Sequence, residues 1–262
     1  MSQFLFGSGF MTGIPTADAQ GNAIANPSPA QFGVLQDISV DFEFDNKLLH
    51  GQGQFPVAVG RGKGKVSGKA KSAKVNGAMF NSLFFGGTLT NGIVAVVNDV
   101  IGKAIPTTPF TLTAGATNNA TTFQIPNSGT WSRDLGVLDS NGQAMTRVAS
   151  APTTGQYTVS AGVYVFAAAD VGLTVYISYE YTATSTSAKS MALVNQPMGY
   201  APTFSANLAM PYQGKNFYLR LVQCVSKKLS FAAKNDDFTV PEMDFDAFAD
   251  AAGNVAYIYT TE

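Results

Sequence analysis

The chain has 262 residues, a net charge of −1, one cysteine, one histidine and only 13% charged residues. These numbers exclude an intrachain disulfide and a zinc site built from several cysteines and histidines, and they give no general attraction to nucleic acid or membrane. The many glycines and phenylalanines favour strands and turns, so we expect a mostly-β fold. A surface with so few charges suits a subunit that neighbours cover.

Residues 1–33 are rich in glycine, proline and alanine, and their hydrophobic periodicity is weak. We expect an extended N-terminal arm that docks on a neighbouring subunit. The first residues lack the basic and apolar regions of a secretory signal, and no apolar run has the length of a membrane span. The sequence therefore predicts no membrane partner.

Two segments show the alternating pattern of strands with one charged face. In residues 34–45 the charged face is acidic, with Asp37, Asp41, Glu43 and Asp45. In residues 63–71 it is basic, with Lys63, Lys65, Lys69 and Lys71. The other face of the basic segment carries only glycine, valine and alanine, which predicts close packing against the phenylalanines that follow.

The basic strand has two interpretations. Its lysines either face the acids of 34–45, in the same subunit or in the next one, or contact a phosphate backbone. Opposite charges on facing strands contribute a few tenths to about 1 kcal/mol each and fix the strand register. We favour the pairing of the two strands.

Residues 78–85 predict a short flanking helix. Asn76 is a candidate N-cap, and Gly86 follows the last apolar residue as a stop signal. Apolar pairs four residues apart form its core face, which consists of Met79, Phe80, Leu83 and Phe84.

Residues 110–182 read as strands and turns, and we expect a β-rich insertion or an elaboration of the core. The best hairpin joins 163–167 to 173–181, where alternate residues from Leu173 to Tyr181 are apolar and share one face. The C-terminal part carries an acidic run that we interpret as a solvated or interface-facing surface. Its members are Asp236, Asp237, Glu242, Asp244 and Asp246.

Residue patterns of known catalytic and metal sites do not occur. The glycine- and lysine-rich segment 60–69 has the wrong spacing for a phosphate-binding loop, and the acidic run lacks the glycine and final glutamate of a calcium loop. His50 lies in a turn-like setting, and Cys224 lies in an apolar strand, where we expect a buried small side chain. We therefore expect no enzyme activity, no metal and no cofactor.

Several segments together resemble the tail-tube (major tail) proteins of tailed bacteriophages. The resemblance spans most of the chain and is weakest in residues 88–150. The segments that carry it are Phe32–Phe42, Gly51–Val57, Gly62–Lys71, Asn76–Gly86, Gly155–Tyr157, Gly162–Phe166, Asn195–Phe204 and Asp237–Val255.

The resemblance implies a β-sandwich-like or barrel-like core with one flanking helix and long loops, built from residues 34–109 and 183–262. It implies hexameric rings stacked into a tube, with 1–33 and 46–60 as candidate contacts between rings. Other tail proteins would bind at the tube ends, a tape-measure protein would occupy the lumen, and viral DNA would pass through during ejection. The protein would be made in the host bacterial cytoplasm and reside in the virion tail.

Two other functions remain as alternatives. One is a different virion component, such as a head-decoration or tail-terminator subunit. The other is a carbohydrate-binding or hydrolytic β-sandwich, which requires exposed aromatic clusters beside carboxylates. Most aromatic residues here fall on the apolar faces of predicted strands, which disfavours this second alternative.

Overall fold

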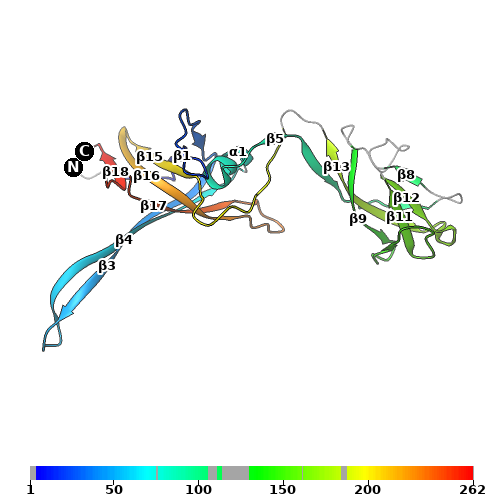
Figure 1. Ribbon diagram of the computed structural model, residues 1–262, viewed down its shortest axis with the longest axis horizontal. Coiled ribbons are helices and arrows are strands. Elements are labelled where there is room, and N and C mark those ends of the chain that lie inside the picture. Colours follow the sequence, from blue (N-terminus) through cyan, green and yellow to red (C-terminus); the bar gives the residue numbers. More distant parts are fainter. Residues whose placement is uncertain are drawn as a thin grey trace. The chain divides into compact units, whose positions relative to one another are not determined.

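A computed structural model describes residues 4–74, 76–105, 111–113, 130–160, 162–183 and 188–261. The chain divides into two compact units, with Met1–Leu89 and Met191–Glu262 forming unit 1 and Thr90–Ser190 forming unit 2. Antiparallel sheets dominate both units, and the predicted mostly-β fold with a short helix is confirmed (Figure 1).

Unit 1 is built on one eight-stranded sheet with the order β2-β1-β15-β16-β17-β4-β3, in which β18 also pairs with β16. All pairings between these strands are antiparallel. The strands are β1 (Phe10–Ala17), β2 (Ala30–Gln31), β3 (Leu35–His50), β4 (Pro56–Ser72), β15 (Thr203–Tyr212), β16 (Lys215–Ser230), β17 (Glu242–Phe248) and β18 (Ala256–Thr260).

The predicted N-terminal arm, residues 1–33, is wrong over much of its length. Strand β1 pairs with β15, and both Met11 and Phe32 are buried in the core. Gly13 explains how so glycine-rich a segment enters a core, because a Cβ at this position would lie 2.8 Å from Leu83 Cδ1. The lack of a side chain at Gly13 thus leaves room for Leu83 of the helical segment.

The helical segment begins with α1 (Gly77–Phe80) and continues as a π-helical turn, η1 (Asn81–Phe85). The side chain of Asn76 accepts a hydrogen bond from the backbone N–H of Met79 at 3.2 Å, as expected for an N-cap. The segment ends at Gly86, whose φ of 60° is left-handed. Buried Met79, Phe80 and Leu83 and half-buried Phe84 face the core.

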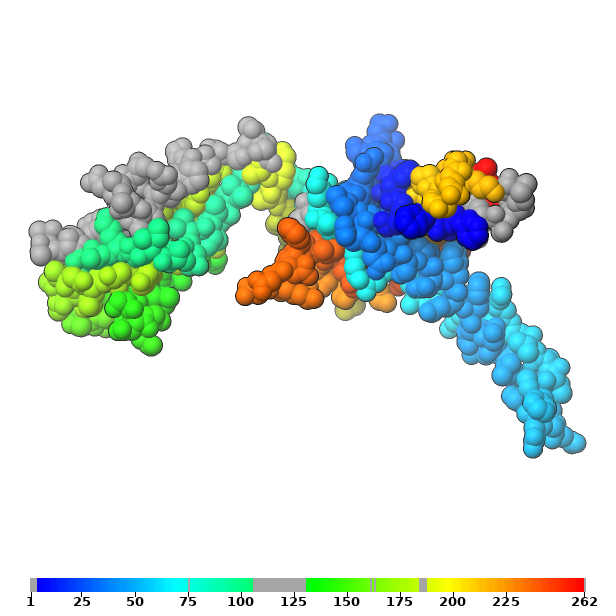
Figure 2. All heavy atoms as spheres, turned by 180° about the vertical axis from the view of Figure 1, so that it is seen from behind, coloured from blue at the N-terminus to red at the C-terminus, as the bar shows by residue number. Residues whose placement is uncertain are grey.

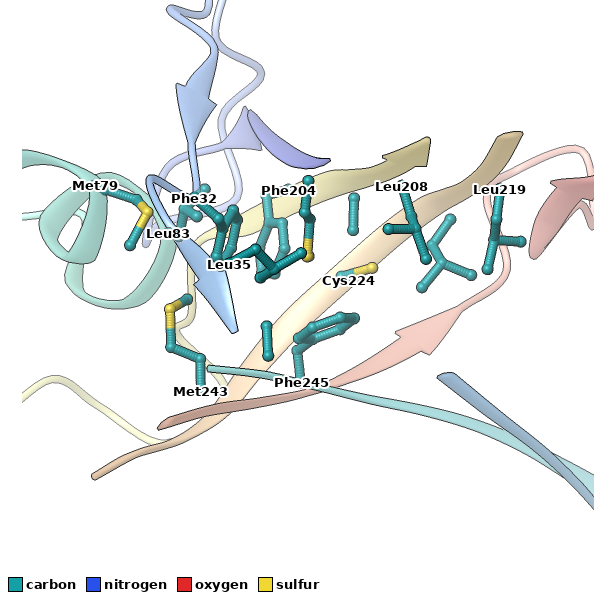
Figure 3. Packing of buried hydrophobic residues seen from close by; sticks show 14 of the residues in the cluster. Phe32, Leu35, Met79, Leu83, Phe204, Leu208, Leu219, Cys224, Met243 and Phe245 are labelled. Carbon is teal, nitrogen blue, oxygen red and sulfur yellow. The ribbon is translucent and has the colours of Figure 1, made fainter. Parts of the chain in front are cut away.

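The core of unit 1 lies between the sheet and this helical segment (Figure 3). Phe204 and Phe245 meet edge to face with their ring centroids 5.8 Å apart. A Cβ on Gly68 would lie only 2.2 Å from the Phe245 ring. The bulky side chain against Gly68 is therefore Phe245 of the neighbouring strand, which was not predicted. Val66 and Ala70 of the same face share the core cluster with Phe80, one of the phenylalanines that follow.

Unit 2 contains two sheets that share one core cluster. In one sheet β13 is flanked by β6, β7 and β9, and in the other the order is β10-β11-β12-β8. Buried tyrosines from both sheets, among them Tyr157, Tyr164 and Tyr179, meet between them. The elements are β6 (Ile93–Val97), β7 (Lys103–Ala104), β8 (Thr111–Thr113), β9 (Thr130–Asp139), β10 (Thr146–Arg147), β11 (Gln156–Ser160), β12 (Val163–Phe166), the 3-10 turn η2 (Ala168–Asp170) and β13 (Thr174–Ala183).

The bounds of the predicted insertion need correction. The expected 110–182 becomes Thr90–Ser190, because β6 and β7 pair with β13 and therefore belong with it. Where the chain enters and leaves unit 2, β5 (Thr90–Asn91) pairs with β14 (Lys189–Ser190). An insertion through two adjacent strands leaves unit 1 free to form its own sheet.

The predicted hairpin between 163–167 and 173–181 has the correct strands and the wrong pairing. Strand β12 pairs with β11 and β8, whereas β13 pairs with β9. The predicted apolar face of β13 is nevertheless buried from Val175 to Tyr181.

We predict that Gly68→Ala destabilises unit 1 by about 1–3 kcal/mol, the usual cost of overpacking a core. The physical reason is the clash with the buried Phe245 ring. Chemical denaturation of the dilute protein measures the effect. Gly60→Ala is the matched control on the same strand, because a Cβ there would meet nothing within 4 Å. Equal losses in both variants would contradict the assignment.

Candidate assembly surface

Strands β3 and β4 extend together beyond the sheet that anchors them. They pair from Leu35 opposite Ser72 to His50 opposite Pro56, whereas β17 pairs with β4 only along 66–71. Residues 42–65, here named the ribbon, therefore form two strands that no other described strand joins. Figures 1 and 2 show the ribbon projecting from unit 1. The candidate ring contact 46–60 thus lies mostly on strands, and only 51–55 connect them.

Apolar side chains on both faces of the distal ribbon, residues 46–60, are exposed. Leu48 lies opposite Val59, and Leu49, which points to the other face, lies opposite Ala58. Phe55 at the turn is 80% exposed and Val57 is 69% exposed. A two-stranded hairpin is marginally stable in water by itself. Exposed apolar surface of this extent is typical of interaction sites.

The base of the sheet carries the predicted charges as alternating stripes, here named the charged face. Strands β3 and β17 supply acids, and β4 and β16 supply lysines. The members are Asp37, Asp41, Glu43, Lys65, Lys69, Lys71, Glu242, Asp244, Asp246, Lys227 and Lys228. Each acidic stripe thus lies beside a basic one, which favours this strand order over others.

Ion pairs within the chain hold the stripes together. Lys71 Nζ lies 3.3 Å from Asp37 Oδ2, and Lys69 Nζ lies 2.8 Å from Glu242 Oε1. Lys228 reaches the same Glu242 oxygen at 3.5 Å. Part of the basic strand therefore pairs within the subunit, with β17 as well as with the predicted acidic strand β3.

Other predicted charges have no such partner. Lys63, Lys65, Asp41 and Glu43 make no ion pair within 4.0 Å with any described residue. Asp45 does pair, with Lys47 at 2.6 Å on its own strand. The unpaired charges lie on the ribbon or at its base, so they are available to another molecule.

The residues of the predicted acidic C-terminal surface fall into two groups. Glu242, Asp244 and Asp246 belong to β17 and face lysines, whereas Asp236 and Asp237 lie in the exposed turn before it. The hydrogen bond from Lys69 lowers the pKa of Glu242, and the same contact raises the pKa of Lys69. The ionised pair therefore stabilises the folded sheet at neutral pH.

Unit 2 contains a polar cluster that the sequence did not predict. The Asp134 carboxylate on β9 accepts hydrogen bonds from the hydroxyl groups of Tyr157 at 2.7 Å and Tyr164 at 2.9 Å. Burial is the main cause of the raised pKa of both tyrosines. Because Asp134 and the tyrosines come from different sheets, the cluster ties the two sheets together. Its strands are distant in sequence, and no local signal marks it.

Within the described parts of the chain, no three histidine, cysteine, aspartate or glutamate side chains gather closely enough to hold a metal. None of the described helices has the length and apolar character needed to cross a bilayer. Comparison with known proteins yields no matching family model and no matching curated protein.

We predict that Glu242→Gln lowers the melting temperature of the dilute subunit at pH 7. The native carboxylate has a pKa below its ordinary value of about 4.3. Its contribution is therefore present above the unfolded-state pKa and is lost as the pH falls through the folded-state pKa. The difference in melting temperature from the unchanged protein should therefore shrink as the pH falls below the folded-state pKa. Asp41→Asn is the control, and a larger effect of that variant would contradict the prediction.

We also predict opposite outcomes for two charge reversals on β4. Lys69→Glu places like charges beside Glu242 and Asp244, so it should lower the melting temperature of the dilute subunit. Lys63→Glu breaks no described ion pair, so it should leave the melting temperature unchanged and reduce self-association. Calorimetry and light scattering measure the two effects. Unchanged association of the Lys63 variant would show that this lysine is not part of an interface.

Proposed function

We propose that this protein is a structural subunit of a bacteriophage tail tube, which assembles into stacked hexameric rings whose lumen conducts DNA during ejection. The single observation that carries the proposal is the ribbon, whose apolar side chains are exposed on both faces. The ribbon gives the reason for self-assembly. The resemblance of many segments to tail-tube proteins gives the form of the assembly.

The free energy gained by burying the apolar side chains of the ribbon supports an assembly with several contacts per subunit. Complete burial of one large apolar side chain contributes roughly 1.5–3 kcal/mol. The five exposed side chains of the ribbon are on average about two-thirds exposed, so covering them yields on the order of 5–10 kcal/mol. The five are Leu48, Leu49, Phe55, Val57 and Val59. Association costs about 4–15 kcal/mol in lost freedom. One ribbon contact therefore nearly breaks even, and a closed ring or stack, which makes several at once, is stable.

The unpaired edge of β3 also supports assembly into a closed ring. This strand is 16 residues long and ends the sheet, so one row of its backbone N–H and C=O groups has no strand partner among the described residues. Such an edge is a template for pairing with another chain. A ring of identical subunits closes this edge without a second protein.

The charged face suits a wall along which DNA moves without sticking. Lys69 and Lys71 are neutralised by acids of the same subunit. Affinity for DNA grows with the number of phosphates that free lysines and arginines neutralise. Lysines held in ion pairs, with acidic stripes beside them, therefore bind DNA weakly. This matches transient passage without sequence-specific binding.

We predict that the chain expressed alone forms hollow tubes with sixfold rings, visible by electron microscopy. Replacement of residues 46–60 by an Asn-Gly turn should leave a folded subunit that forms no tubes, because the exposed apolar surface is gone. Far-ultraviolet circular dichroism and thermal unfolding verify the fold. Single rings of fixed size would favour a tail terminator instead, and monomers at all concentrations would contradict the proposal.

A further inference from the structure

A cavity of about 510 Å³ opens on the apolar side of the sheet in unit 1. Ile38 and Val40 of β3 form one wall, and Leu208 and Leu219 lie buried at its floor. Both leucines appear in Figure 3, on the adjacent strands β15 and β16. Ile258 of β18 lines the cavity and is exposed. The cavity is therefore apolar and accessible from outside.

We propose that this cavity receives the distal ribbon, residues 46–60, of a second copy of the chain. The proposal rests on the self-assembly proposed above and adds the surface that accepts the ribbon. The cavity is hereafter the acceptor, and the distal ribbon is the donor.

The ribbon of the same chain cannot fill the acceptor. Strand β3 forms a wall of the cavity at 38–42 and then runs on, fully paired with β4, to His50. At the rise of an extended strand, its end lies roughly 25 Å beyond Phe42. The donor and the acceptor of one subunit are thus held apart by the regular structure that joins them, and the occupant comes from another molecule.

Apolar character and charge both match the donor to the acceptor. Phe55 and Val57 are large apolar side chains with little cover of their own, and the walls and floor of the acceptor are apolar. Asp37 lines the acceptor, and no lysine or arginine is among its described lining residues. The donor and its flanks, residues 44–64, carry three cations, Lys47, Arg61 and Lys63, against one acid, Asp45. Asp37 is already paired with Lys71. The net charge of +2 on the donor therefore meets no lysine or arginine in the lining that would repel it.

Donor and acceptor are different surfaces, so the contact they form is head-to-tail. Each subunit gives one ribbon and receives one. A contact of this kind closes into a ring when the rotation between subunits divides a full turn, and otherwise continues as a helical filament. The contact therefore extends to any number of copies without another protein.

The test combines two variants that each lose one surface. Phe55→Asp with Val57→Asp removes the donor, and Met210→Glu with Ile258→Glu removes the acceptor. We expect each variant alone to be monomeric by light scattering at every concentration. A mixture at high protein concentration, which a single near-break-even contact requires, should give a discrete one-to-one dimer that does not grow. Phe238→Asp is the matched control at a side chain that is 90% exposed outside both surfaces, and it should assemble as the unchanged chain does.

Other outcomes overturn the proposal. A mixture that stays monomeric, or donor and acceptor variants that each still form large assemblies, excludes the head-to-tail contact. Loss of assembly in Phe4→Ser with Phe6→Ser, together with normal assembly of the donor variant, assigns the acceptor to the N-terminal segment of another copy. This segment leads into Gly7 and Ser8 at the cavity.

Cross-linking gives a second test that does not depend on variants with charges in the sheet. Val57→Cys and Ile258→Cys chains are mixed and treated with a short bis-maleimide. We expect a linked pair that contains one of each. Cys224 does not compete, because it is buried and burial raises its pKa to about 12. Tubes that form without this linked pair would leave the proposed function standing and refute the acceptor.

Discussion

A two-stranded ribbon cannot cover both of its own faces, and this constraint governs the structure of unit 1. Strands β3 and β4 leave the sheet with glycines at 60, 62 and 64 on one strand and exposed apolar residues on both. The rest of the sheet anchors them. Strand β17 pairs with residues 66–71 of β4, and Phe245 occupies the space that Gly68 leaves. The base is therefore anchored by neighbouring strands, while the distal half would be covered by another copy in the proposed assembly.

The charges follow the same division between base and ribbon. At the base, Glu242 receives Lys69 and Lys228, and Asp37 receives Lys71, so the stripes fix the order and register of four strands. Along the ribbon, Lys63 and Lys65 have no ion pair to a described residue. Surface ion pairs contribute little individually. Their value at the base lies in fixing the register of the strands, and the unpaired charges along the ribbon would select the partner in the proposed assembly.

Period-two alternation predicted β3, β4 and the buried face of β13, because one buried face leaves a local trace in the sequence. It also predicted that acidic and basic strands face each other. It could not predict that β17 pairs with the other edge of β4 and supplies a second set of acids to the lysines, because Glu242 and Lys69 are far apart in the chain. The predicted pairing of 163–167 with 173–181 failed for a different reason, because β12 pairs with β11, the strand just before it in the chain. The acceptor was also beyond reach, since Ile38, Leu208 and Ile258 converge only through the strand order.

Amide hydrogen exchange of the ribbon, compared between dilute subunit and assembly, tests the central claim most directly. Backbone groups on the free edge of β3 and side chains of the distal ribbon are covered only in the assembly under this account. Amides of 42–50 and 57–65 should therefore exchange rapidly in the dilute subunit and become strongly protected in the assembly, while those of β15 and β16 are protected in both. Equal exchange of the ribbon amides in both states would contradict the account.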